Sequence, residues 1–517
     1  MATTPTELLL PRALDREAAV ALLAKRLTLE AGRPRAEDRL VLDSFDGRLR
    51  AAGLRAERPP GRRRGELTLH EPGAPARHVE VGAAKRHLMS DLPDGPVRRR
   101  LADVLEMRAL LPVVRLRSSV LPLAVVNGDG KTVVRLVIER AEAIDGSQHV
   151  ALPPRLTVEP VLGYDDDLER TLRVLRERLE LEPAERPVFD EAVVATGGRL
   201  GGVLSKPQLA LAPGTHADAA AAEVLTQLAA ITEANVPGTI ADLDTEFLHD
   251  LRVAVRRARA VLRELEGVHD PEQRARVRAE LKWIQAATGP VRDLDVQLLG
   301  WDELIAPLAS ERAADLEPLR NLLERRRARE FARLRRSLRG ARFAAAVGAW
   351  RALATTASAD TEGPDATEAI DVLAADRIRR VYRRMVRDGS EIGEDSPAEA
   401  LHDLRKRGKE LRYLLEMFGG LFEPKVVKPM VKTLKQLQDV LGDFQDTAVQ
   451  SELLRDLRDD LAAEPGGPAA LIGVGAVIEA LAAVQQDARD HFAGRFSTFA
   501  AADQRALVRD TFPKRAT

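Results

Sequence analysis

The sequence predicts an α+β protein of several domains, in which a β-rich N-terminal region precedes an all-helical C-terminal region. Residues 1–205 contain short segments with alternating or β-branched apolar residues, separated by Gly, Pro, Asn and Asp. From about residue 217 onward, apolar residues recur at three and four positions, which is typical of amphipathic helices. The length of 517 residues suits two to four domains.

The N-terminal region is expected to form an antiparallel sheet. The motif NGDG at 127–130 is a strong hairpin signal between two such segments. Helices are expected at 14–29 and 167–181, and the Gly- and Pro-containing stretch before residue 217 is typical of a linker. We therefore place a domain at 1–205, a linker at 206–216 and a helical domain at 217–512. The segments expected as strands are 65–70, 76–82, 112–119, 131–143 and 155–163.

The composition narrows the class of protein. Hydrophobic residues make up 45% and charged residues 31%, so the chain can build real cores. The absence of cysteine excludes disulfides and thiolate metal sites and is typical of a reducing compartment. The first residues lack the basic and apolar segments of a signal peptide, and we find no stretch approaching the roughly 20 apolar residues of a membrane span. We therefore expect a cytoplasmic protein with no membrane partner.

The helical region contains an internal repeat. The pentapeptide LHDLR occurs at 248–252 and again at 401–405, 153 positions later. The same offset relates Pro271 to Pro424, Gly289 to Gly442 and Asp293 to Asp446. A fixed offset over some fifty residues indicates duplicated structural units. We place the repeats at about 217–354 and 368–512, joined by the polar stretch 355–367, and expect a pseudo-two-fold pair of helical bundles that share a groove.

Each repeat places cations on one face of the LHDLR helix. In the first repeat they follow the histidine at three, seven and ten positions, and the second repeat has basic residues at the same offsets. The next helix also carries regularly spaced cations. Duplication of this pattern favours a shared function over chance solvation. The two cationic faces consist of His249, Arg252, Arg256 and Arg259 in the first repeat and His402, Arg405, Lys409 and Arg412 in the second.

Two facing cationic helices suit a linear polyphosphate. Such a polymer has dense, regular charge and no base to recognise, and its oxygens match arginine forks. A protonated histidine would bind an oxyanion better than a neutral one. Net charge is only −1, with 79 basic and 80 acidic residues, so the cations must be locally segregated to act in this way.

Three other interpretations compete with this one. The adjacent pairs His249-Asp250 and His402-Asp403 could indicate an HD-type metal phosphohydrolase, but neighbouring helical residues point about 100° apart and cations occupy the histidine face. We expect these aspartates to face elsewhere, near the helix starts. A nucleic-acid groove is disfavoured because aromatic residues amount to 3%. Each histidine could instead be a core residue near an N-cap. This interpretation is less favoured because both repeats place the histidine at the start of a cationic face.

Basic and acidic residues elsewhere in the repeats are interpreted structurally. Residues 322–343 contain nine arginines and two glutamates, and acidic neighbours from other helices are the favoured explanation. Asp293 and Asp446 are expected to orient a basic side chain or to cap a helix.

At these residues the chain resembles the CHAD family, the conserved-histidine α-helical domain. The motifs HDLRVAVRRARAVL, HDLRKRGKELRYLLEMF, LKWIQAATGPVRDLDV and LKQLQDVLGDFQDTAV carry the likeness, in order, over about 217–512. The resemblance implies two four-helix bundles with a basic channel that binds inorganic polyphosphate without catalysis, and it suggests association with polyphosphate granules. Gly408 and Glu410 depart from the regular pattern, and a helical glycine costs about 1 kcal/mol relative to alanine. To the two cationic faces the resemblance adds Lys282, Lys428, Lys432 and Lys435.

The N-terminal region resembles a degenerate CYTH domain, the triphosphate tunnel β-barrel. The segments at 42–58, 65–70 and 156–175 fall in the expected order. The family needs a Glu-x-Glu-x-Lys strand to hold metal and phosphate, whereas the corresponding ELLLP keeps Glu7 and has Leu9 and Pro11 at the other two positions. We therefore expect no catalytic residues, no metal and no cofactor. The alternatives left open are a metal-dependent tripolyphosphatase in this domain and a general polyanion or nucleic-acid binder.

Overall fold

The computed structural model describes residues 5–61, 64–82, 84–355 and 363–515. The chain divides into two compact units, Met1–Leu204 and Ser205–Thr517, which are described separately. Most of the predicted connector at 355–367 lies outside the described residues.

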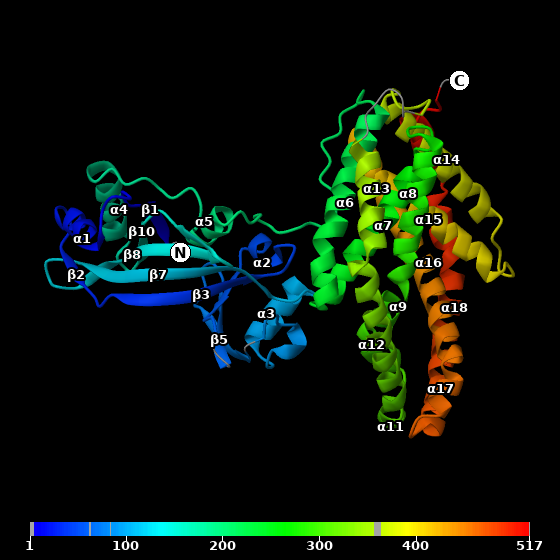
Figure 1. Cartoon of the computed structure of the whole chain (residues 1–517), viewed down its shortest axis with the longest axis horizontal. Helices are drawn as coiled ribbons and strands as arrows, with labels where there is room; N and C mark the ends of the chain where they lie inside the picture. The colour runs from blue at the N-terminus through cyan, green and yellow to red at the C-terminus, as the bar shows by residue number, and fades with distance from the viewer. Residues whose placement is uncertain (1–4, 62–63, 83, 356–362, 516–517) are drawn as a thin grey trace. The chain divides into compact units, whose positions relative to one another are not determined.

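The N-terminal unit is built on one ten-stranded antiparallel sheet (Figure 1). The strand order is β1-β10-β8-β7-β3-β4-β5-β6, with β2 paired to β7 and β9 paired to β8. The strands are β1 (Thr6–Leu9), β2 (Leu29–Ala31), β3 (Arg35–Asp43), β4 (Arg55–Arg58), β5 (Arg64–His70), β6 (Arg77–Gly82), β7 (Leu111–Val126), β8 (Thr132–Asp145), β9 (Gln148–Ala151) and β10 (Arg155–Pro160).

The sheet is not closed into a barrel, so the expected CYTH-like barrel is wrong in this respect. In the described chain, β1 and β6 lie at opposite ends of the strand order and do not pair with each other. Helices cover the sheet instead and form three separate apolar clusters with it. They are α1 (Arg16–Ala24), α2 (Arg48–Ala51), α3 (Pro96–Leu105), α4 (Asp165–Arg173) with its continuation η2 (Val174–Arg178), and α5 (Val188–Ala195), with the short η1 (Met89–Asp91) before α3.

The predicted hairpin at NGDG joins β7 to β8. The Asn127 side-chain oxygen accepts hydrogen bonds from the backbone N–H groups of Asp129 and Lys131, at 3.1 and 3.0 Å. Gly130 has a φ of +73°, a conformation that a residue with a Cβ rarely adopts. The turn therefore fixes the register of the two longest strands of the sheet, as the motif indicated.

The C-terminal unit is helical throughout, apart from turns and loops, over its described residues. In the first repeat α6 packs along α7 and α13, α7 contacts α8, and α9 contacts α12. Its helices are α6 (Ala217–Ala241), α7 (Thr245–Glu264), α8 (Pro271–Ala287), α9 (Gly289–Leu299), α10 (Trp301–Ile305), α11 (Ser310–Ala314), α12 (Glu317–Arg339) and α13 (Ala341–Thr355).

The second repeat uses fewer and longer helices. α15 contacts α14 and α16, and α16 runs along α18. α16 is continuous where the first repeat breaks into α8 and α9 at Thr288. Its helices are α14 (Ile370–Ser390), α15 (Ala398–Phe418), η3 (Gly419–Leu421), α16 (Pro424–Asp456), α17 (Arg458–Ala462), α18 (Gly467–Phe499) and α19 (Ala502–Thr511).

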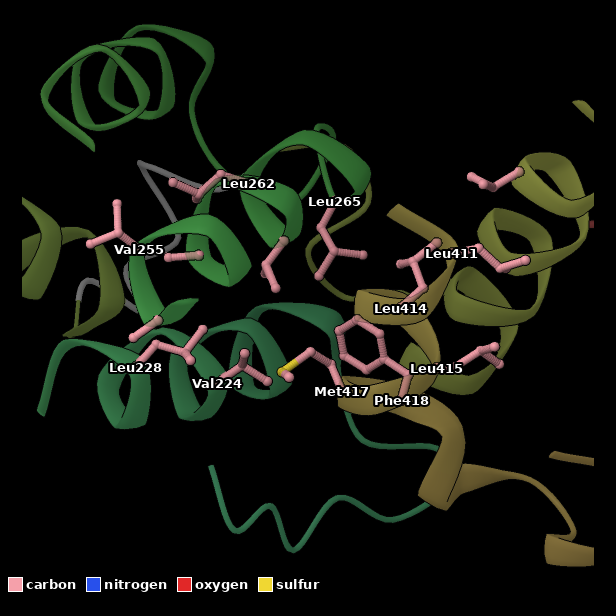
Figure 2. Packing of buried hydrophobic residues seen from close by; sticks show 14 of the residues in the cluster. Val224, Leu228, Val255, Leu262, Leu265, Leu411, Leu414, Leu415, Met417 and Phe418 are labelled. Atoms are coloured by element: carbon pink, nitrogen blue, oxygen red, sulfur yellow. The ribbon is translucent and has the colours of Figure 1, made fainter. Parts of the chain in front are cut away.

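One apolar core joins the two repeats. Val224 and Leu228 of α6, Leu262 of α7, and Leu411 and Met417 of α15 belong to the same buried cluster (Figure 2). Because residues from both repeats fill this core, the LHDLR helices α7 and α15 are held in direct contact.

The α18 helix corrects one sequence-based expectation. By length and composition it is apolar enough to cross a membrane, and only 28% of its most apolar 18-residue window is buried. The expectation that no segment reaches this length and hydropathy is therefore wrong.

Candidate functional site

The candidate site lies along α7 and α15, and two reciprocal ion pairs join these helices. Arg257 Nη2 lies 2.7 Å from Glu416 Oε2, and Arg263 Nη2 lies 3.2 Å from Glu410 Oε2. The repeat offset of 153 relates Arg257 to Glu410 and Arg263 to Glu416. Exchanging the repeats therefore turns one pair of positions into the other, with both arginines on α7 and both glutamates on α15. The pairing of positions is the one expected around a pseudo-two-fold axis, whereas the charges themselves are not repeated.

The two histidines of the repeated motif occupy the second turn of their helices. α7 begins at Thr245, and the Asp244 carboxylate caps it by accepting from the N–H groups of Glu246 and Phe247. His249 and His402 are both partly buried. Since each helix begins four or more residues earlier, neither histidine is at an N-cap.

The surroundings of the two histidines differ. His402 Nδ1 lies 2.5 Å from Gln445 Oε1, whereas the repeat offset places Arg292 at the matching position of the first repeat. Arg292 Nη1 lies 3.7 Å from Glu246 Oε1, next to His249. The two ends of the site are therefore equivalent in backbone position and different in chemistry.

Arg252 is held at the start of the cationic face of α7. Its Nη1 donates to the backbone oxygen of Gln285 at 2.9 Å and to Thr288 Oγ1 at 2.8 Å. Burial lowers the pKa of Arg252 to about 10; Asp293 partly offsets this, while Arg256 lowers it further. The neutral hydrogen-bond acceptors position this guanidinium without cancelling its charge.

Arg256 of α7 and Lys409 of α15 bring the two repeats together electrostatically. Burial, followed by the charges of Arg405 and Arg256, lowers the pKa of Lys409 to about 8. The Arg256 Nε atom is buried and has no hydrogen-bond partner. Within the described ranges, no carboxylate lies within 4.0 Å of the charged groups of Arg256, Arg259 or Lys409. Arg405 and Arg256 therefore repel Lys409, and the more distant Asp446 offsets this repulsion only in part.

The remaining cations of the two faces are partly neutralised. Arg405 Nη2 donates to Asp446 Oδ1 at 2.8 Å, and Arg412 Nε donates to Glu416 Oε1 at 2.8 Å. The Asp446 side chain is 67% exposed, so its pair with Arg405 is a weak surface interaction that a denser anion can displace. Asp446 thus orients a basic side chain, which was one of the two roles expected for it.

The lysines of the neighbouring helices flank this surface. Lys428, Lys432 and Lys435 are exposed and follow one another on α16, and Lys435 lies eleven residues before Asp446. Eleven residues are close to three helical turns, so Lys435 and Asp446 share the face that meets Arg405. Lys282 is the exposed equivalent on α8. These four lysines make no ion pair within the described parts of the chain.

Two cations at the site were not among the predicted ligands. Arg278 of α8 contributes to the lowered pKa of Arg259, after burial and Arg263. Arg292 lowers the pKa of Arg252. The spacing of Arg274, Arg278 and Lys282 could have identified Arg278. No repeat signal could have identified Arg292, because the second repeat has Gln445 in its place.

The structure also tests the metal interpretation of the His-Asp pairs. Possible ligand atoms of Glu246, His249 and Asp250 all lie within 4.8 Å of one another. Asp250 is 5% exposed and lies beside His249, so the expectation that it faces elsewhere is wrong. In the second repeat the Asp403 side chain is 60% exposed and pairs with Lys406 at 2.9 Å. The cluster of Glu246, His249 and Asp250 is therefore specific to the first repeat, because Asp403 is placed differently in the second.

Family comparison agrees with this repeated geometry. Residues 222–455 match the model of the CHAD domain. This segment is a CHAD domain. It includes α7, α8, α9, α15 and nearly all of α16, and thus every candidate ligand named above.

Relatives and solved structures show how far the likeness extends. Two proteins of Mycobacterium tuberculosis, Uncharacterized protein Rv2226 of strain H37Rv and Uncharacterized protein MT2285 of strain CDC 1551, are each 28% identical over 225 residues, or 43% of this chain. The match spans 42% of the length of these relatives. The crystal structure of the CHAD domain from the plant Ricinus communis is 22% identical, with a TM-score of 0.48 over 56% of this chain and 95% of that one. PptA from Streptomyces chartreusis is 17% identical, with a TM-score of 0.44 over 55% and 99%.

The charged side chains of the N-terminal unit are arranged differently. Glu7 accepts a hydrogen bond from Arg155 Nη1 at 2.5 Å, and the Arg155 side chain is 3% exposed. Arg39 pairs with Glu139, and Arg115 donates to Asp38 at 2.7 Å. Carboxylates of the same chain therefore engage Arg39, Arg115 and Arg155 in this unit.

Proposed function

We propose that the CHAD domain binds inorganic polyphosphate, without chemical change to the polymer, along the surface formed by α7 and α15. The observation that carries the proposal is that Arg256 of α7 and Lys409 of α15 lie close enough to repel each other, with no carboxylate within 4.0 Å of either charged group in the described chain. Burial, together with repulsion from Arg405 and Arg256, lowers the pKa of Lys409 in the free protein, so a bound polyanion would relieve an unfavourable interaction.

A phosphate polymer fits this surface better than a single phosphate. The cations recur along two helices, and α7 alone carries Arg252, Arg256 and Arg259 over about 10 Å of axial rise. Arginine forks bind phosphate oxygens in pairs, while lysines act as point charges. The flanking lysines extend the cationic path beyond the two helices. The proposed contact residues are His249, Arg252, Arg256, Arg259, Lys282, His402, Arg405, Lys409, Arg412, Lys428, Lys432 and Lys435.

The reciprocal ion pairs support two pseudo-symmetric helical bundles around this surface. We infer that the duplication created a continuous path because each repeat supplies one cationic helix. The proposal places the protein in the cytoplasm with its polymer, at polyphosphate granules.

We propose no catalysis for the N-terminal unit. Arg155 engages Glu7, the remaining acidic residue of the expected metal-binding strand. Leu9 and Pro11 supply neither a ligand nor a charge at the other two positions. Phosphate release from tripolyphosphate by the full chain, measured with Mg²⁺ or Mn²⁺, would overturn this part of the proposal.

The main experiment is a titration of the full chain with long-chain polyphosphate, tripolyphosphate and RNA at physiological salt. We expect polyphosphate to bind more tightly than the other two, because its charge density is higher than that of RNA and its length spans both repeats. Equal affinity for RNA would contradict a polyphosphate-specific site and would indicate a general polyanion binder.

A further inference from the structure

A second basic surface lies on α14 and α19, apart from the cationic faces of α7 and α15. α14 contains six arginines, whereas α6, which the repeat offset of 153 aligns with it, contains no lysine or arginine. The duplicated fold therefore does not require these cations. They belong to the second repeat alone.

The arginines of α14 form a cationic ridge at helical spacing. Arg379, Arg383 and Arg387 follow one another at four-residue intervals, so their guanidinium groups share one face. Like charges at this spacing destabilise a helix unless a counter-ion is present. Arg380 pairs with Asp376 at 2.8 Å, and Arg387 pairs with the adjacent Asp388 at 2.8 Å.

Other cations of this surface form no close ion pair in the described chain. Within the described ranges, no carboxylate lies within 4.0 Å of the charged groups of Arg379, Arg383, Arg384, Arg505 or Lys514. Arg379 Nη1 donates to the backbone oxygens of Arg509 and Phe512, at 3.3 and 3.4 Å. Neutral acceptors thus hold Arg379 in place without cancelling its charge.

The ridge borders two adjoining hollows. One, of about 430 Å³, is lined by five α14 arginines together with Asp376 and Lys514. The other, of about 330 Å³, continues over Tyr382, Val386 and Val508 to Arg505 and Arg509 of α19. The two hollows share Arg379, Arg383 and Arg387. A small, multiply charged anion could therefore contact α14, α19 and Lys514 together.

The other arginine-rich helix of this unit, α12, provides a comparison for α14. On α12, carboxylates of other segments pair with Arg325, Arg326 and Arg327, and Glu330 pairs with Arg333, whereas no ion pair is found in the described chain for the exposed Arg329, Arg335, Arg336 and Arg339. This result supports the structural interpretation of residues 322–343. α14 differs because its unpaired arginines converge on a concavity.

The geometry points to a second anion site on α14 and α19 that binds short inorganic oligophosphates, such as pyrophosphate or tripolyphosphate, independently of the α7–α15 surface. Arginine is suited to this ligand because its planar fork presents paired donors to phosphate oxygens. The apolar floor of Tyr382, Val386 and Val508 reduces the local dielectric, which strengthens attraction between the anion and the arginines. The Tyr382 hydroxyl donates to the Phe499 backbone oxygen at 2.9 Å and serves the fold.

The test is calorimetric titration of tripolyphosphate into four forms of the full chain. The first two are the natural protein and R256E/K409E, called the channel variant because it changes the α7–α15 surface. The third is the quadruple variant R256E/K409E/R383E/R387E. The fourth is a charge-matched control, R256E/K409E/R329E/R336E, whose last two changes lie on exposed positions of α12. We expect the channel variant and the control to retain a binding event with similar affinity. We expect the quadruple variant to lose at least about tenfold in that affinity.

The outcomes separate this inference from the proposed function. Equal residual binding by the channel and quadruple variants would overturn the α14–α19 site, as would an equal loss in the control. If R256E/K409E left polyphosphate binding unchanged while the quadruple variant lost tripolyphosphate binding, the proposed function would fail and this site would stand. Circular dichroism of each variant shows whether the helices remain folded.

Discussion

The buried arginines of the N-terminal sheet and the central cations of the α7–α15 surface differ in how their charge is balanced. In the N-terminal unit, Arg155 meets Glu7 and Arg39 meets Glu139. In the C-terminal unit, Arg256 and Lys409 face each other with no carboxylate within 4.0 Å in the described residues. A buried cation that is paired by its own chain serves the fold. Cations that remain unpaired and repel one another indicate an external anion.

Charge reversal on α7 and α15 gives the largest expected effect. The double variant R256E/K409E replaces two cations of the proposed surface with carboxylates that repel the polymer. We expect its affinity for long-chain polyphosphate to fall by at least about 100-fold, while its helicity is unchanged. Fluorescence anisotropy with labelled polyphosphate measures the affinity, and circular dichroism measures the helicity. R329E/R336E on α12 makes the same change in net charge and should bind like the natural protein.

Removing Arg155 from its pair with Glu7 in the N-terminal unit should lower stability and leave polyphosphate binding unchanged. Arg155→Met leaves Glu7 facing a site that no longer holds a cation and removes the donor to the Arg186 backbone oxygen. We expect the free energy of unfolding of this unit to fall by about 3–5 kcal/mol, with polyphosphate affinity unchanged. Urea denaturation measures the stability. A decrease in the free energy of unfolding of less than about 1 kcal/mol would show that the Arg155–Glu7 pair does not stabilise the fold in this way.

A change of pH should alter polyphosphate affinity less than charge reversal does, and the affinity should fall as the pH rises. Lys409 has a pKa of about 8 in the free protein, below its usual range, so it loses its proton as the pH rises through 8. A bound anion favours the protonated form. Affinity should therefore be full below pH 7 and fall by up to about tenfold per pH unit above 8. K409R, whose guanidinium stays charged, should flatten the profile; an equally steep profile in K409R would assign the proton to another group.

The smallest effect is expected at Gly408 in α15. A Cβ at this position would meet Gln438 at 3.4 Å and Met385 at 3.5 Å, which is ordinary packing distance. G408A should therefore raise the free energy of unfolding by up to about 1 kcal/mol, because alanine has the higher helix propensity. Thermal denaturation measures this gain, and polyphosphate affinity should not change. A loss of stability would show that α15 needs this close approach to α16.

The repeat made the helical part of the site predictable from the sequence. The offset of 153 identified α7 and α15 as equivalent helices, and helical spacing identified their cationic faces. The sequence could not show which cations are neutralised, because partners such as Glu416 for Arg257 lie 159 residues away and depend on packing. For the same reason it missed Arg292, whose contact with Glu246 has no copy in the second repeat.

The sheet of the N-terminal unit was only partly predictable. The NGDG turn and the alternating patterns located β5 to β8 and β10. Closure into a barrel depends on pairing between strands distant in sequence, and local patterns carry no information about it. The strands β2, β3, β4 and β9 were not predicted. For β2, β4 and β9, three or four residues give too little alternation.

The most direct test of the unpaired-cation account is the pKa of Lys409, measured by NMR from the side-chain carbon next to Nζ, with and without polyphosphate. The free protein should give a pKa of about 8, and bound polyphosphate should raise it toward or above the ordinary value of 10.5. R329E/R336E should show the same upward shift. A Lys409 pKa that is near 10.5 in the free protein, or that does not change when polyphosphate binds, would contradict the account.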